Sequence, residues 1–136
     1  MDFVVDTNII ISSLIASSGK TREIIFSDEI KLLAPELLLR EIVKHEKEIM
    51  RKSGLTRQEL KTALTIISTR MEFVPYKEFK KFIKMAKRIS PDANDAEFIA
   101  LALAKNAAIW SNDKVLKKQV EVKVFTTAEI AKIKKL

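Results

Sequence analysis

The chain has 136 residues, no cysteine and one histidine, and 25 basic against 18 acidic side chains give it a net charge of +7. The length predicts a single domain over residues 1–136. The lack of cysteine excludes disulfides and thiolate metal sites, and two glycines exclude the glycine-rich loops that bind nucleotide phosphates. The charge favours a polyanionic partner, RNA or DNA, with a solvated lysine-rich surface as the alternative.

The first segment lacks the basic region of a secretion signal, and no stretch of about 18 apolar residues occurs anywhere. We therefore expect a cytoplasmic protein without a membrane partner. No internal repeat and no linker rich in proline, glycine or serine divides the chain.

Strands and helices are expected to alternate along the chain. The first half is predicted to contain strands at 3–5 and 31–34 and helices at 8–15, 21–26, 36–51 and 57–68. The second half is predicted to contain strands at 72–74, 108–111 and 122–125, helices at 76–89, 92–107 and 127–135, and a helical turn at 115–118. This alternation predicts a three-layer α/β/α sandwich around a mainly parallel five-stranded sheet.

Two of the predicted strands lead directly to an acidic residue. Asp6 follows the first strand, and Asp113 follows the fourth. In open parallel sheets, sites form outside the carboxyl ends of the strands, at a topological switch point. We therefore expect two distant segments to bring carboxylates to the same edge of the sheet. As an alternative, each aspartate is only a cap for the helical segment that follows it.

Two predicted helices add carboxylates at the border of an apolar face. Glu41 follows Leu37 and Leu38 by one helical turn, and Asp95 stands at the amino end of an apolar face that Asp92 shares. A carboxylate there is costly unless a cation pairs with it, and no basic residue occupies these positions. Oxygen ligands suit Mg²⁺ or Mn²⁺, ions that activate water and stabilise the oxygens of a phosphodiester displacement.

These motifs resemble those of the PIN-domain family of small metal-dependent ribonucleases, which includes the toxins of VapBC toxin–antitoxin pairs. Four segments carry the resemblance: VVDTNI at 4–9, LLREI at 38–42, DANDAEFIALALA at 92–104 and WSNDK at 110–114. Their order and spacing match over nearly the whole chain. The resemblance implies a parallel five-stranded sheet and the activity of an RNA-cleaving hydrolase.

The resemblance also implies a site. Its catalytic residues and ligands for Mg²⁺ or Mn²⁺ are Asp6, Glu41, Asp95 and Asp113. Asn8 and Ser111 are implied as polar groups near the metal or water. Asp92 is a further acid of the third motif, so either Asp92 or Asp95 is the closer ligand, and helical phase favours Asp95. A homodimer is implied, as is, for a toxin, an antitoxin that blocks the pocket.

Basic and aromatic residues suggest contacts with RNA. Arg40 and Lys114, which stand beside acids of the motifs, are candidate RNA contacts. The basic segment 76–89 offers lysines for phosphate contact and aromatic rings for stacking, although aromatic residues at helical spacing are usually core. His45 lies one turn after Glu41 and is expected to be a surface histidine rather than part of the site.

Three other functions compete with a toxin nuclease. A ribosomal RNA processing nuclease would share all four motifs. A phosphoryl-transfer hydrolase using Asp6 needs a second acid two residues later, where this chain has Asn8. A non-catalytic RNA-binding module is disfavoured by the complete acidic set. A nuclease should not accept a phosphoryl group on Asp6, whereas the phosphoryl-transfer hydrolase should.

Overall fold

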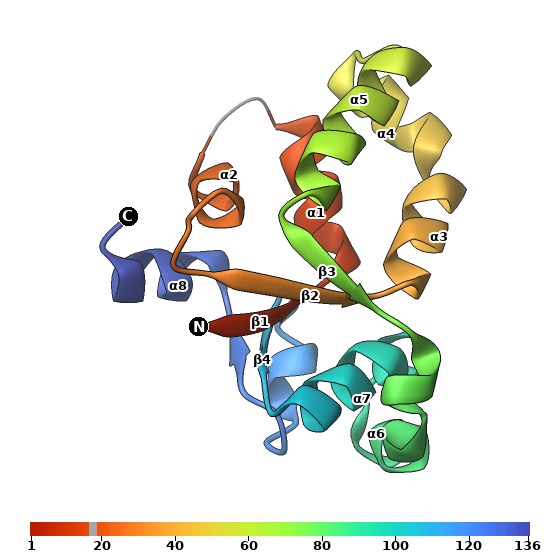
Figure 1. Cartoon of the computed structure of the whole chain (residues 1–136), viewed down its shortest axis with the longest axis vertical. Coiled ribbons are helices and arrows are strands. Elements are labelled where there is room, and N and C mark those ends of the chain that lie inside the picture. Colours follow the sequence, from red (N-terminus) through yellow and green to blue (C-terminus); the bar gives the residue numbers. More distant parts are fainter. Residues whose placement is uncertain (17–18) are drawn as a thin grey trace.

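The strands assemble into one sheet between two layers of helices (Figure 1). The computed structural model describes residues 1–16 and 19–136. Within them the strands are β1 (Asp2–Val5), β2 (Lys31–Pro35), β3 (Met71–Val74), β4 (Ala108–Trp110) and β5 (Val124–Phe125). Their order is β3-β2-β1-β4-β5, and every neighbouring pair is parallel. The predicted sheet is confirmed, and it is parallel throughout.

Helices cover both faces of this sheet. The α-helices are α1 (Thr7–Ile15), α2 (Lys20–Ile25), α3 (Leu37–Lys44), α4 (Glu46–Ser53), α5 (Arg57–Ser68), α6 (Ile83–Ile89), α7 (Ala96–Lys105) and α8 (Thr127–Lys134). Short 3-10 turns are η1 (Tyr76–Glu78), η2 (Lys80–Phe82), η3 (Ala93–Asp95) and η4 (Leu116–Lys118). In Figure 1, α6 and α7 lie on one face, and α1 to α5 lie on the other. Among the described residues, no helix is long and apolar enough to cross a membrane.

The centre of the sheet is buried from both sides. Phe3, Val4 and Val5 of β1 have no exposed surface, as expected for a parallel strand covered by helices on both faces. Phe3 packs edge-to-face against Phe125 of β5, with ring centroids 5.7 Å apart. Trp110 of β4 is also fully buried, and its indole N–H donates to Thr127 Oγ1 at 3.0 Å.

The order of the strands places a switch point between β1 and β4. The chain builds β1, β2 and β3 toward one edge, then crosses back and adds β4 on the other side of β1. The Asp6 N–H donates to the Trp110 carbonyl at 3.0 Å, which holds the carboxyl ends of the two strands together. Sites of open parallel sheets form at this place.

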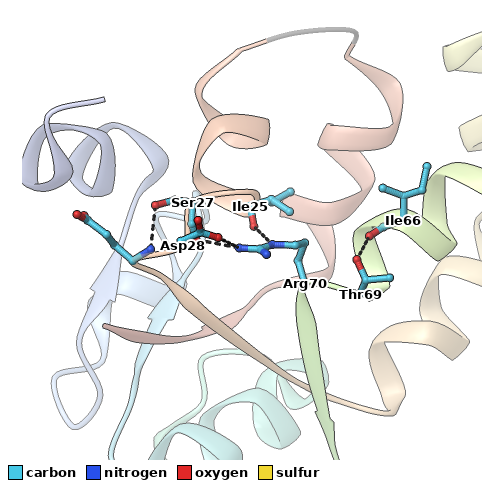
Figure 2. A network of polar contacts seen from close by, with 7 residues as sticks. Ile25, Ser27, Asp28, Ile66, Thr69 and Arg70 are labelled. Carbon is cyan, nitrogen blue, oxygen red and sulfur yellow. Dashed lines mark hydrogen bonds and ion pairs between the residues drawn. The ribbon is translucent and has the colours of Figure 1, made fainter.

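One arginine joins the opposite end of the sheet to the helix layer (Figure 2). The Arg70 guanidinium, just before β3, donates to the carbonyls of Ile25 and Ser27 at 3.3 and 3.1 Å. It also donates to the Asp28 carboxylate at 3.3 Å. These bonds satisfy carbonyls at the end of α2 and in the turn before β2, so they fix that turn relative to β3.

The long helix predicted over 36–51 is broken. Its two parts, α3 and α4, meet at His45, whose backbone is not helical (φ −100°, ψ 11°). The change of direction lets both Ile42 and Ile49 reach the core, where they are 2% and 1% exposed. Burial of two apolar faces thus outweighs helix continuity at this residue.

The helix predicted over 76–89 is α-helical only in α6. Residues 76–82 form the two 3-10 turns η1 and η2 instead. Phe79 is fully buried, and Phe82 packs partly against the core. Residues three apart eclipse each other in a 3-10 helix, so both rings face inward. They are therefore core residues rather than a stacking surface for bases.

Two further boundaries differ from the prediction. The helix expected over 92–107 begins with the 3-10 turn η3 and ends at Asn106, whose φ of 50° is left-handed. The strand expected over 122–125 is reduced to two residues. The Gln119 side chain explains this, because its amide binds both the N–H and the carbonyl of Val122, at 3.0 and 2.7 Å.

Candidate active site

The predicted acidic residues come together in one pocket. Asp6 follows β1, Glu41 lies on α3, Asp95 ends η3, and Asp113 follows β4. These four residues and Asp92 line a pocket of about 230 Å³ at the carboxyl ends of β1 and β4. The other residues that line it are Thr7, Asn8, Ile11, His45, Asn94 and Phe98. Five carboxyl groups therefore share one pocket, and no lysine or arginine is among the described residues that line it.

Asp6 is held in place by Ser111. The Ser111 hydroxyl donates to Asp6 Oδ2 at 2.6 Å and accepts the Asp113 N–H at 3.1 Å. Ser111 is fully buried at the end of β4, so this bond is shielded from water. Burial raises the pKa of Asp6, and the Ser111 bond opposes the rise. Asp6 occupies the N-cap position of α1 without a side-chain capping bond, although the backbone N–H groups of Asn8 and Thr7 also oppose the rise of its pKa.

Glu41 is held by a residue that the sequence motifs did not single out. The Thr7 hydroxyl donates to Glu41 Oε1 at 2.6 Å, and Thr7 is 6% exposed in the first turn of α1. Thr7 directly follows Asp6, so the first turn of α1 extends from one acid toward another. That adjacency is the signal in the sequence that could have pointed to Thr7.

Asp95 experiences the charge of the other acids. Its pKa is raised to about 6 by burial and then by the negative charges of Asp6, Asp92, Asp113 and Glu41. Such repulsion requires the carboxylates to be close to one another. Half-buried Asp95 thus fits the pocket better than exposed Asp92, in agreement with the preference from helical phase.

Burial of Asp95, together with repulsion from the other acids, predicts a pH-dependent stability. The pKa of Asp95 rises from 3.8 to about 6 on folding, so the folded protein loses stability as the pH rises from about 4 through 6. An Asp95→Asn variant cannot ionise there and escapes this loss. In EDTA at about pH 7 it should melt a few degrees above the wild type, with the difference vanishing near pH 4. Calorimetric melting curves across this range measure the effect.

The control for this measurement is Glu121→Gln, which removes an exposed carboxylate away from the acidic pocket. Its melting temperature should follow that of the wild type at each pH. An Asp95→Asn variant that melts below the wild type at neutral pH would contradict the repulsion.

Asp113 and Asp92 combine a local role with their place in the pocket. Asp113 Oδ1 accepts the Val115 N–H at 2.9 Å, and Asp92 Oδ1 accepts the Asn94 N–H at 2.9 Å. Asp113 thus closes a local turn with Val115, but it does not cap η4, whose N-cap residue is Val115 and which has no side-chain capping bond. Asp92 caps η3, but the reciprocal bond of a capping box with Asp95 is not formed among the described contacts. A capping bond uses one oxygen and leaves the other available.

The remaining sequence candidates lie around the pocket. Asn8 lines it, whereas Ser111 lies behind Asp6. Arg40 and Lys114 are exposed and are not among the residues that line the pocket. His45 is exposed, as expected, but it also lines the pocket, because the break between α3 and α4 places it at the rim.

Glu97 is a second residue that sequence reasoning missed. It lies in the first turn of α7, and its pKa is raised by burial and by the charge of Glu41, against the opposing charge of Arg40. Its helical position, two residues after Asp95, points away from the predicted acidic face. The charges of Arg40 and Glu41, both on α3, act on Glu97, which places it in the same electrostatic environment.

The donors of this pocket fit a hard divalent cation by their chemistry. Within residues 1–16 and 19–136, no three acidic or histidine side chains are gathered closely enough to hold a metal ion as they stand. The donors themselves are carboxylate, hydroxyl and amide oxygens, the ligands that Mg²⁺ and Mn²⁺ prefer. A divalent ion would also relieve the repulsion that raises the pKa of Asp95.

A wider hollow, of about 620 Å³, lies at the opposite edge of the sheet. It is lined by residues such as Asp2, Asn106 and Phe125. Its charged side chains are the two acids Asp2 and Glu121 and the base Lys123, so it is much less acidic than the first pocket. The acidic pocket is therefore the stronger candidate for chemistry.

Comparison with known proteins identifies the family and a similar fold. A family model described as PIN domain matches residues 4–132. Among solved structures, the fold is similar to the crystal structure of VapBC2 from Rickettsia felis bound to a DNA fragment from their promoter, with a TM-score of 0.68 and 15% identity. That match covers 93% of this chain and 98% of the other. Comparison with curated proteins gave no match.

Proposed function

The chain belongs to the PIN-domain family, and on that basis we propose that it is a nuclease that hydrolyses RNA with the help of Mg²⁺ or Mn²⁺. One observation carries the proposal: five carboxyl groups from four separate segments line a single pocket at the switch point of the sheet. The family match spans nearly all of residues 1–136, which supports a single nuclease domain.

Two of the proposed metal ligands are oriented by hydrogen bonds from neighbouring hydroxyl groups. Ser111 orients the Asp6 carboxylate, and Thr7 orients that of Glu41, each through a bond of 2.6 Å. Asp95 and Asp113 complete the set, and Asp92 lies at the rim. A bound divalent cation polarises the scissile phosphate and lowers the pKa of water. No side chain of the chain is then needed as a nucleophile.

A metal ion that binds only the folded protein stabilises it by mass action. Mn²⁺ at about 100 times its dissociation constant should stabilise the folded protein by about 2.7 kcal/mol, if the unfolded chain does not bind it. Asp6→Asn should lose most of this gain. Thermal melts in increasing Mn²⁺ against EDTA measure both, and equal gains in the two proteins would contradict Asp6 as a ligand.

The direct test is cleavage of single-stranded RNA by the purified protein in Mn²⁺, Mg²⁺ or EDTA. We expect cleavage with either ion and none in EDTA. Incubation with a labelled phosphoryl donor tests the rival hydrolase, which would form a phosphoaspartate at Asp6. Label on Asp6 without RNA cleavage would contradict the nuclease, and RNA binding without cleavage would favour the non-catalytic module.

We further propose that the nuclease is the toxin of a toxin–antitoxin pair. The similarity to a VapBC2 structure favours this role over ribosomal RNA processing. Induced expression in a bacterial host should stop growth, and Asp6→Asn should restore it. Growth unaffected by an active nuclease would favour the processing role.

A further inference from the structure

The most basic segment of the chain lies beside the acidic pocket without belonging to it. Residues 76–89, which form η1, η2 and α6, contain six basic residues and one acid. We call the six side chains the basic track: Lys77, Lys80, Lys81, Lys84, Lys87 and Arg88. All six are exposed, and among the described contacts none forms an ion pair with a carboxylate. The segment has a net charge of +5 within a chain of +7.

The packing of residues 76–89 against α7 determines the path of the basic track. Its one acid, Glu78, pairs at 2.9 Å with Lys105 at the far end of α7. The segment then runs back along α7, with α6 packed against that helix, and ends at Ile89, three residues before Asp92 of the pocket (Figure 1). The track thus follows the length of α7, about 15 Å for a helix of this size, and leads to the rim of the acidic pocket.

The charges of the two regions are opposite. Five carboxyl groups line the pocket, and they repel the phosphates that flank a scissile bond. An extended polyanion that places one phosphate in the pocket needs cations for its neighbours. The basic track offers them on one side, whereas residues 37–53 of α3 and α4, on the other side, carry five basic and three acidic residues.

The basic track is suited to contact the sugar–phosphate backbone of a nucleic acid rather than its bases. Phe79 is fully buried, and Phe82 packs against the core, so neither ring is free to stack on a base. Tyr76 is 46% exposed, but its ring packs edge-to-face on buried Phe79. Contact through lysine and arginine with phosphates carries no sequence information.

We propose that the basic track binds the sugar–phosphate backbone of the single-stranded RNA on one side of the scissile phosphate. The proposal rests on the proposed nuclease function for the identity of the polyanion. The track supplies affinity without sequence preference, and the acidic pocket supplies the chemistry.

The test is the salt dependence of RNA binding. A labelled single-stranded RNA is titrated by fluorescence anisotropy in EDTA between about 50 and 200 mM KCl, so that no cleavage is needed. The track variant combines Lys84→Ala, Lys87→Ala and Arg88→Ala, since alanine favours the helix at these exposed positions. The control variant combines Lys123→Ala, Lys132→Ala and Lys135→Ala, three exposed residues on or near β5 and α8.

Both variants lose three positive charges, so a difference between them reports position rather than net charge. For single strands each phosphate contact adds about 0.7 to the slope of log K against log salt. The track variant should lower that slope by about 2 and weaken binding roughly 10- to 50-fold at about 0.15 M salt. The control variant should change the slope and the affinity much less.

Equal losses in the two variants would overturn the proposal, as would a wild type that does not bind RNA at low salt. Poly-glutamate that displaces the RNA at equal charge concentration would assign the track to an acidic protein instead. If the triple variant melts much earlier than the wild type, Lys87→Ala alone should still lower the slope by about 0.7. RNA binding through the track without cleavage in Mn²⁺ would contradict the proposed function while leaving the track as a binding surface.

Discussion

Asp6→Asn is expected to lower RNA cleavage roughly 10³-fold, or about 4 kcal/mol of transition-state stabilisation, while the protein stays folded. The substitution removes the one carboxylate that lies between β1 and β4 and is oriented by buried Ser111. An amide oxygen can still accept the Ser111 hydroxyl, so the local geometry is kept and the negative charge is lost. Single-turnover cleavage of a labelled RNA in Mn²⁺ measures the effect.

Stability provides the check on this variant. Burial raises the pKa of Asp6, so its carboxylate is held in the fold at a cost above that pKa, and a neutral amide should not destabilise the protein. The matched control is Asp2→Asn, an exposed residue at the opposite end of β1. Cleavage that survives in Asp6→Asn, in a preparation free of contaminating nuclease, would refute the assigned site.

Trp110→Ala is expected to have the largest effect on stability, a loss of about 3–5 kcal/mol. Trp110 is fully buried in β4, and its indole N–H also loses the bond to Thr127. Domains of this size are stable by about 5–15 kcal/mol, so the variant should lose a large part of its unfolding free energy and unfold at a much lower urea concentration. Urea denaturation followed by circular dichroism gives the difference in unfolding free energy.

This variant also tests how the sheet positions the site. The Trp110 carbonyl accepts the Asp6 N–H, and Ser111 follows directly in the chain, so loosening β4 should reduce cleavage as well. Thr127→Val removes the acceptor of the indole bond and of the bond that the Asn112 side-chain amide donates at 3.1 Å, and it should cost about 1–2 kcal/mol. A loss below about 1 kcal/mol for Trp110→Ala would show that β4 is packed differently from the described core.

The pattern of apolar residues in the sequence made the architecture predictable. Continuous apolar runs at 3–5 and 31–34 indicated strands buried on both faces, and Gly54 with the capping box of Thr56 and Glu59 marked one helix boundary, which the structure reproduces. Errors arose where a tertiary contact overrode a local pattern. The break at His45 and the shortened β5 depend on the core behind Ile49 and on a side-chain bond from Gln119.

The acidic residues of the pocket were predictable because topology decides where strand ends meet. Asp6 and Asp113 follow strands that lie far apart in sequence and next to each other in the sheet. Thr7 and Glu97 were not predicted, because the bond from Thr7 to Glu41 and the effect of the Glu41 charge on Glu97 depend on how close the fold brings α3 to them. A single sequence does not encode that distance in any local pattern.

The central claim is that the acidic pocket cleaves RNA through the negative charge of its carboxylates, and Asp113→Asn tests it most directly. Asn can keep the bond from the Val115 N–H that Asp113 Oδ1 accepts at 2.9 Å, so this substitution removes charge and preserves the local turn. Cleavage of single-stranded RNA is compared between wild type and variant in Mn²⁺, Mg²⁺ and EDTA. We predict cleavage by the wild type with either ion, none in EDTA, and a large loss in the variant. Cleavage that persists in EDTA, or that is equal in the two proteins, would contradict the claim.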